Sequence, residues 1–203
     1  MAGVTAAATA AGCVTGAYLL GTLPTATVVG RSAGHDPTVE GSGNPGASNV
    51  YRIAGRRAGL AVFLVDAAKG AVATAAGLAI GGRPLGIACG MAAVAGHVFP
   101  ASRRFRGGRG VATSGGFVLV VFPVVGAACV VGWVAVARAT RRASLASLAL
   151  VVGAPIGVAL SGRPGWETAA AAAVAALVGA RHAGNVRRLL HGEERALPVG
   201  ERH

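Results

Sequence analysis

A chain of 203 residues that is 53% hydrophobic and only 13% charged, with a mean hydropathy of +0.60, has the composition of an integral membrane protein and not of a soluble domain. The formal net charge is +12, but the arginines lie in short gaps between apolar runs and form no basic helix face, which argues against nucleic-acid binding. The three cysteines stand singly inside apolar runs. We therefore expect no disulfide, no metal site and no cofactor.

Long apolar runs predict helices that cross a membrane. The first run has no basic segment before it and is too long for a signal peptide, so we expect it to remain as the first span. No strand-like alternation is present, which predicts one all-α, polytopic membrane bundle over residues 1–203. The runs cover approximately residues 4–30, 58–80, 85–100, 111–137, 144–160 and 168–180.

The arginines between these runs predict the orientation of the chain. They are frequent in gaps 31–57, 101–110 and 138–143 and after residue 180, whereas gaps 81–84 and 161–167 hold one each. Because cytoplasmic loops collect Arg and Lys, the N-terminus is expected outside and the C-terminus in the cytoplasm. This pattern requires residues 111–137 to fold as a hairpin near Pro123, giving about seven spans; a five-span bundle is the alternative.

Residues 41–52, GSGNPGASNVYR, form a polar loop that a membrane span does not need. Gly and Asn tolerate left-handed backbone, so successive N–H groups can line an anion-binding concavity. Ser42 and neighbouring polar side chains add neutral donors, and Arg52 adds a guanidinium fork suited to phosphate. A flexible turn between helices is the alternative.

A second polar segment, residues 96–113, contains Gly107-Gly108-Arg109-Gly110 immediately before a predicted helix. The free N–H groups of such a loop and the positive end of the helix dipole favour a phosphate group. The spacing is not that of a P-loop. An ordinary basic loop after a span is the alternative.

The third polar segment, residues 181–194, follows the last predicted span. On a continuing helix His182 and Asn185 would share a face, where the first could transfer a proton and the second could orient a carbonyl. The alternative is a basic juxtamembrane helix that binds anionic membrane lipid.

Two further polar positions lie at or inside predicted spans. Asp66 and Lys69 are spaced for an ion pair within one helix, and substrate contact by Lys69 is the second interpretation. Ser144, in the segment RRASLAS, is placed to cap a helix N-terminus.

Taken in order, GSGNPGASNVYR, DAAKG, GHVFP…FRGGRGVAT, RRASLAS and RHAGNVRRLLHGEE resemble the bacterial membrane glycerol-3-phosphate acyltransferases of the PlsY family, over about residues 18–194. Residues 195–203 would then be a short cytoplasmic tail. The resemblance implies an enzyme of phospholipid biosynthesis in the inner membrane, with its active site at the cytoplasmic face. Such an enzyme moves a fatty acyl group from acyl phosphate to the 1-hydroxyl of glycerol 3-phosphate and releases lysophosphatidic acid and phosphate.

The resemblance also implies roles for individual residues. The catalytic set is Ser42, Arg52, His182 and Asn185, and Glu194 matches a structural acid. The substrate-binding set comprises Asn44, Ser48, Asn49, Gly107, Gly108, Arg109, Gly110, Lys69 and one or both of Ser144 and Ser147.

Three positions depart from the family pattern: Pro45 replaces an aliphatic residue, Ser48 replaces Thr, and Arg109 replaces Lys. Arg keeps the charge of Lys but not its geometry, so phosphate affinity can differ. A small transporter or channel for a phosphorylated metabolite is the alternative function. Transporters usually carry internal repeats, and none is present here.

Overall fold

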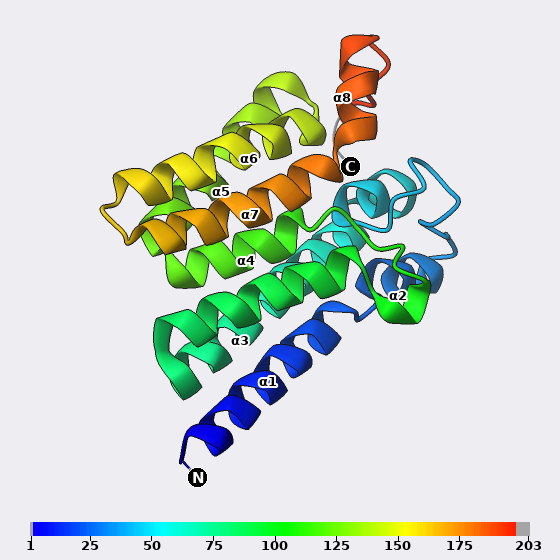
Figure 1. The fold of residues 1–203 in the computed structure, drawn as a ribbon. Coiled ribbons are helices and arrows are strands. Elements are labelled where there is room, and N and C mark those ends of the chain that lie inside the picture. Colours follow the sequence, from blue (N-terminus) through cyan, green and yellow to red (C-terminus); the bar gives the residue numbers. More distant parts are fainter. Residues whose placement is uncertain (1, 198–203) are drawn as a thin grey trace.

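The structure, a computed structural model, describes residues 2–197, and within this range it is entirely helical (Figure 1). The expected all-α fold is therefore confirmed for this part of the chain. Its helices are α1 (Ala2–Gly21), α2 (Thr25–Ser32), α3 (Ala47–Val98), α4 (Val111–Val121), α5 (Pro123–Thr140), α6 (Ala143–Leu160), α7 (Gly165–Ala180) and α8 (Ala183–Leu190), with a 3₁₀ turn at Ala101–Arg103.

Within residues 2–197, four helical stretches are long and apolar enough to cross a membrane. Two shorter apolar helices, α4 and α7, pack among them. The four stretches are Gly3–Ser32, Ala47–Arg103, Pro123–Thr140 and Ala143–Leu160.

The sequence predicted the first apolar run as one continuous span, but in the structure this run is divided into two helices. Helix α1 ends at Gly21, and α2 begins at Thr25, directly after Pro24. Proline lacks an N–H and clashes with the preceding turn, which favours a break of the helix at this position. The break leaves the carbonyl of Leu23 available, and the buried ammonium of Lys69 donates to it at 2.7 Å.

Helix α3 is interrupted twice and therefore comprises three helical pieces. Gly55 breaks it near its start, and non-helical dihedral angles at Gly81 and Gly82 fold it into a hairpin. The two long limbs then lie side by side, with Gly77 of the first against Leu85 and Gly86 of the second. These limbs correspond to the predicted runs at 58–80 and 85–100, and both ends that carry polar segments return to the same end of the bundle (Figure 1).

The long apolar run at 111–137 is also divided, as the arginine pattern required. Helix α4 ends at Val121, and α5 starts with Pro123 in its first turn. The two helices fold back on each other, because Gly126 of α5 lies against the backbone of Leu119 in α4. The predicted break at Pro123 is confirmed.

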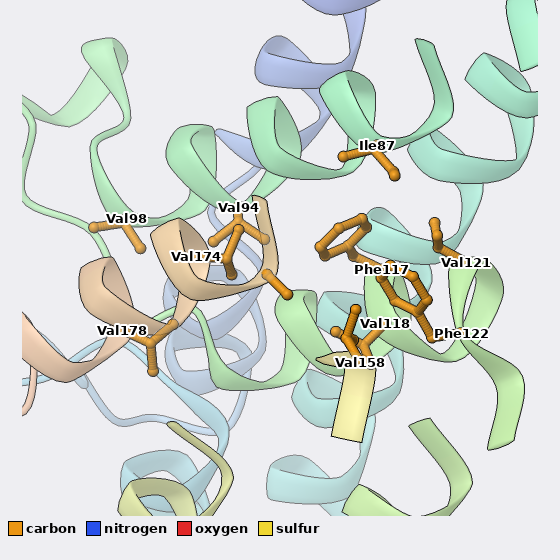
Figure 2. Packing of buried hydrophobic residues seen from close by; sticks show 11 residues of the cluster. Ile87, Val94, Val98, Phe117, Val118, Val121, Phe122, Val158, Val174 and Val178 are labelled. Atoms are coloured by element: carbon orange, nitrogen blue, oxygen red, sulfur yellow. The ribbon is translucent and has the colours of Figure 1, made fainter. Parts of the chain in front are cut away.

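The principal hydrophobic core lies between the second limb of α3, α4, α6 and α7. Its buried residues are Ile87, Val94, Val98, Phe117, Val118, Val121, Phe122, Val158, Ala171, Val174 and Val178. Figure 2 shows Val98 and Val178 at one end of this cluster and Phe122 at the other. Because branched side chains have few rotamers, this core holds the ends of α3 and α7 rigidly in relation to α4.

An ion pair with a buried carboxylate fixes the turn of the α3 hairpin. Arg83 donates through Nε and Nη2 to the two carboxylate oxygens of Glu167 at 2.8 and 2.6 Å. Its Nη1 donates to the carbonyl of Val121, and the guanidinium lies over the ring of Phe122. These contacts join α3, α4 and α7, so the α3 hairpin cannot slide along its neighbours.

Candidate active site

The first polar loop is shaped by a buried asparagine. Asn49, in the first turns of α3, accepts from the backbone N–H of Ser42 at 2.8 Å and donates to the carbonyls of Pro37 and Glu40. Its side-chain amide is thus used for folding the loop, and only 1% of the residue is exposed. Asn49 therefore positions Ser42, whose hydroxyl accepts from the N–H of Asn44 at 3.4 Å.

The glycine loop is attached to the end of α3 through its backbone. The N–H of Gly107 donates to the carbonyl of Val98 at 3.1 Å, and the N–H of Gly108 donates to the backbone carbonyl of His97 at 3.2 Å. Arg181, which follows α7, donates to the carbonyl of Gly107 at 3.1 Å. The loop is therefore fixed by the helices on both sides of it.

Gly108 is the point where the first two polar loops meet. A methyl group at this position would overlap Nε2 of His97 and would come within 3.0 Å of the carbonyl oxygen of Pro45. Pro45, one of the departures from the family pattern, is buried here. Gly110 ends the loop with φ of +83°, which glycine adopts without strain, and α4 begins at the next residue.

The sequence predicts that the third polar segment continues the last span as one helix, but in the structure it does not continue α7. Helix α7 ends at Ala180, and the chain turns at Arg181 and His182 before α8 leaves in a new direction (Figure 1). His182 is 1% exposed. Its Nδ1 lies 2.7 Å from the carbonyl of Val178, and since a carbonyl only accepts, Nδ1 carries the proton and Nε2 has a free lone pair.

Asn185 and Glu194 form a second buried pair at this turn. Nδ2 of Asn185 donates to Glu194 Oε1 at 2.8 Å, and Nε of Arg188 donates to Oε2 at 2.9 Å. This fixes the amide so that its Oδ1 is buried without a hydrogen-bond partner in the described part of the chain. Burial alone would raise the pKa of Glu194, but the nearby hydroxyl of Ser144 and the donors Asn185 and Arg188 outweigh it and hold the pKa below its usual value.

Arginines from all three polar segments interact electrostatically near this carboxylate. Burial first, and then the guanidinium groups of Arg188, Arg52 and Arg181, lower the pKa of Arg109 to about 10, while Glu194 opposes the shift. Arg109 still carries its charge at neutral pH. Four guanidinium groups that influence one another, with one carboxylate among them, leave a positive cluster suited to anions.

Helix N-termini add to this positive character. Helices α3, α4, α6 and α8 all begin without a side-chain cap, so the N–H groups of their first turns are not satisfied by capping side chains. The glycine loop precedes α4 and meets the residues before α3 at Gly108. Asn185, in the first turn of α8, donates to Glu194, and Ser144 lies in the first turn of α6. Together these ends favour negative charge beside the arginines.

The structure distinguishes the two serines that the sequence left open. Ser147 donates to the carbonyl of Ala143 at 2.8 Å and accepts from Nε1 of Trp133 at 3.2 Å, so its hydroxyl is occupied. The hydroxyl of Ser144, in contrast, is buried without a hydrogen-bond partner in residues 2–197, so it is available to a ligand. The prediction that Ser144 caps α6 is wrong, because that helix begins at Ala143 with no side-chain cap.

Lys69 has two hydrogen-bond partners of its own. It is 3% exposed and donates to Asp66 at 2.7 Å as well as to Leu23, so the ion-pair interpretation describes it. Asp66 lies 3.7 Å from Nδ1 of His97, whose Nε2 is against Gly108. The buried residues Lys69, Asp66 and His97 thus follow one another, and His97 contacts the glycine loop at Gly108.

Three comparisons bear on the identity of the chain. A sequence model of the family described as glycerol-3-phosphate acyltransferase matches residues 11–192. The chain belongs to this family. Curated glycerol-3-phosphate acyltransferases are similar to it over most of both chains: that of Thioalkalivibrio sulfidiphilus is 44% identical over 89% of this chain and 90% of its own, and that of Methylococcus capsulatus is 42% identical over 89% and 92%.

A solved structure of the integral membrane glycerol 3-phosphate acyltransferase PlsY (YgiH) in its glycerol 3-phosphate form is similar in both sequence and fold. Its TM-score to this chain is 0.89 with 34% identity, and the match covers 94% of this chain and 96% of that one. The lysophosphatidic acid form of the same protein gives a TM-score of 0.86 with 33% identity. The chain is therefore an acyltransferase and a multi-pass membrane protein.

In this acyltransferase, the sequence identified most of the residues that gather at the cluster but not all of them. Arg52, Arg109, His182, Asn185 and Glu194 are brought together through the charges and hydrogen bonds described above. Arg181 and Arg188 were missed as individual members, because arginines near a membrane usually bind lipid. The available signal was Glu194, an acid within an otherwise basic stretch.

Gly108→Ala is expected to reduce the acyltransferase kcat/KM by about 100-fold, because the new methyl group displaces the glycine loop from His97 and Pro45. The measurement is the initial rate of glycerol 3-phosphate acylation in detergent. Gly115→Ala, in α4 with no atom near the added methyl group, is the matched control and should stay within about twofold of the parent protein. Equal activity of the two variants would contradict the close contact at Gly108.

Proposed function

We propose that this enzyme transfers a fatty acyl group from acyl phosphate to the 1-hydroxyl of glycerol 3-phosphate, giving lysophosphatidic acid and inorganic phosphate. The observation that carries the proposal is the electrostatic cluster of Arg52, Arg109, Arg181 and Arg188, in which Arg188 is paired with the buried carboxylate of Glu194. Both substrates carry phosphate, and a site with several guanidinium groups and uncapped helix N-termini offers charge to bind both.

The chemistry requires one bond to form and one to break. The 1-hydroxyl oxygen attacks the acyl carbonyl carbon, the bond from that carbon to the phosphate oxygen breaks, and phosphate leaves with the bonding electrons. Phosphate is a good leaving group, so positioning and charge stabilisation supply most of the catalysis. Arg52 and Arg109 are proposed to bind the phosphate groups, and Ser42, Asn44, Ser48 and Ser144 to donate to the oxygens around them.

Two hydrogen-bond acceptors among the donors are suited to the attacking hydroxyl. Nε2 of His182 has a free lone pair, and Oδ1 of Asn185 is buried without a partner in residues 2–197. We assign the proton of the 1-hydroxyl to Nε2 of His182 or to a substrate phosphate, and we assign Oδ1 of Asn185 to a hydroxyl of the glycerol moiety. No metal ion or other cofactor enters this mechanism.

The proposed location is the cytoplasmic face of the inner membrane. Seven helices can serve as crossings if the two limbs of α3 count separately and α4 and α5 form a hairpin. The arginine-rich segments then lie on one side, which the charge distribution indicates is the cytoplasm, and the N-terminus lies outside. The chain is taken as one membrane domain over residues 1–203, of which 1 and 198–203 are outside the described residues.

The test is turnover by the protein purified in detergent with palmitoyl phosphate and glycerol 3-phosphate. We expect release of inorganic phosphate that depends on both substrates, together with stoichiometric lysophosphatidic acid. Palmitoyl-CoA in place of palmitoyl phosphate should give no acylation, since the free phosphate group of the donor is then absent from the site. Turnover with the thioester alone would overturn the assigned donor. Uptake of glycerol 3-phosphate into liposomes without turnover would instead favour a transporter.

A further inference from the structure

A short segment after α8, residues 194–197, crosses from the third polar segment to the first, and we call it the strap. Arg52 donates through Nε to the carbonyl of Ala196 at 3.2 Å and through Nη2 to that of Arg195 at 3.1 Å. Two of its three guanidinium nitrogens are thus bonded to main-chain oxygens of the strap. Arg52 is separated from these two residues by 144 and 143 positions in the sequence, so the two hydrogen bonds form only in the complete fold.

Both ends of the strap are anchored to other elements. At its start Glu194 is bonded to Asn185 and Arg188, and at its end the N–H of Leu197 donates to the carbonyl of Arg141 at 2.7 Å. In between, the side chain of Arg195 donates to the carbonyl of Gly41, at the start of the first loop. A segment held at both ends can fix the side chain that it touches, which a free tail cannot do.

Carbonyl oxygens are suitable for this task because they accept hydrogen bonds without neutralising the arginine. A carboxylate in their place would cancel the charge that a phosphate needs. An arginine loses side-chain entropy when it binds a ligand, and holding it in advance reduces that loss. The family model ends at residue 192 and the family resemblance gives a role only to Glu194, so residues 195–197 of the strap have no role assigned by either.

We propose that the strap is a positioning element of the transferase site, whose Arg195 and Ala196 carbonyls hold the Arg52 guanidinium in the orientation that binds substrate phosphate. This rests on the proposed function, because it takes Arg52 as a phosphate ligand. The strap itself touches no substrate and acts through Arg52. Its loss therefore weakens substrate binding more than it slows the chemical step.

The test compares two truncations of the purified protein. Ending the chain after Leu197 keeps every contact described above and is the control. Ending it after Glu194 removes the Ala196 carbonyl and the Leu197 anchor. A second variant, Leu197→Pro, keeps the full length but deletes the N–H that binds Arg141. In the truncation after Glu194 and in Leu197→Pro we expect KM for glycerol 3-phosphate or for palmitoyl phosphate to rise about tenfold, with kcat changed less than about threefold.

A double-mutant cycle with Arg52→Ala separates positioning from a merely structural role. If the strap acts through Arg52, the truncation after Glu194 has no further effect on KM in the Arg52→Ala background. An equal loss in both backgrounds, or an unchanged KM in the truncated parent, would overturn the proposal. Turnover by the control protein is measured first. If that protein is inactive with both substrates the proposed function fails, whereas an active control with an unaffected truncation defeats the strap alone.

Discussion

Arg109→Ala is expected to lower kcat/KM for glycerol 3-phosphate by about 100- to 1,000-fold, the range found when one essential donor to a developing anion is removed. Arg109 is half-buried in the glycine loop, at the centre of the arginine cluster, and its pKa of about 10 leaves it charged at neutral pH. Solvent cannot replace its charge there. The measurement is the initial rate of phosphate release over a range of glycerol 3-phosphate concentrations.

Two further variants make this result specific. Arg109→Lys keeps the positive charge but loses the forked geometry of the guanidinium group, so its kcat/KM should stay within about tenfold of that of the parent protein. Arg106→Ala removes an exposed arginine from the same loop and should change the rate less than twofold or so. If Arg109→Ala lost no more than Arg106→Ala, the loop would contribute only general basic charge, and its assignment to phosphate would be wrong.

The sequence predicted the polar loops and their gathering at one end of the bundle (Figure 1) because each prediction rests on local chemistry. Glycine and asparagine cluster where the backbone must turn, arginines lie where spans end, and Pro123 interrupts an apolar run that the charge pattern already divided. These signals are carried by neighbouring residues. They therefore gave both the helical hairpin at 111–137 and the polar segments that meet in the fold.

Features that depend on distant partners could not be predicted in this way. Asn49 reads as a ligand in the sequence, yet its amide is used to fold residues 37–42. Lys69 is bonded to Leu23 only because Pro24 ends α1 at that place. The bond from Arg52 to Ala196 spans 144 positions, and no local pattern distinguishes that arginine from one that meets solvent. Such assignments need the tertiary fold.

The break between α7 and α8 shows that two residues predicted on one helix face can be buried together by a different geometry. The spacing of His182 and Asn185 predicted one face of a continuing helix, and both residues do point into the bundle. They are brought together because the chain turns at His182, whose carbonyl accepts from the N–H of Asn185 at 2.8 Å. At this turn the imidazole of His182 lies close enough to Arg109 and Arg181 for their charges to lower its pKa.

His182→Gln is expected to reduce kcat/KM by about 100- to 10,000-fold if Nε2 of this residue takes the proton from the attacking hydroxyl. Burial, followed by the charges of Arg109 and Arg181, lowers the pKa of His182 below 6.5, against the opposing effects of Val178 and Glu194. The imidazole is therefore neutral at pH 7. Activity of the parent enzyme should be flat above pH 6.5 and should fall as the pH drops through the lowered pKa, where Nε2 gains a proton.

The pH profile of the variant decides which group accepts the proton. A substrate phosphate has a second pKa near 6, so it can produce an acid limb of its own. If His182 is the base, His182→Gln is slow at every pH, and the acid limb due to the imidazole is lost. If the phosphate is the base, the variant loses less than about tenfold and keeps the same limb. His191→Ala, which alters an exposed histidine on the following turn, is the control and should leave both rate and profile unchanged.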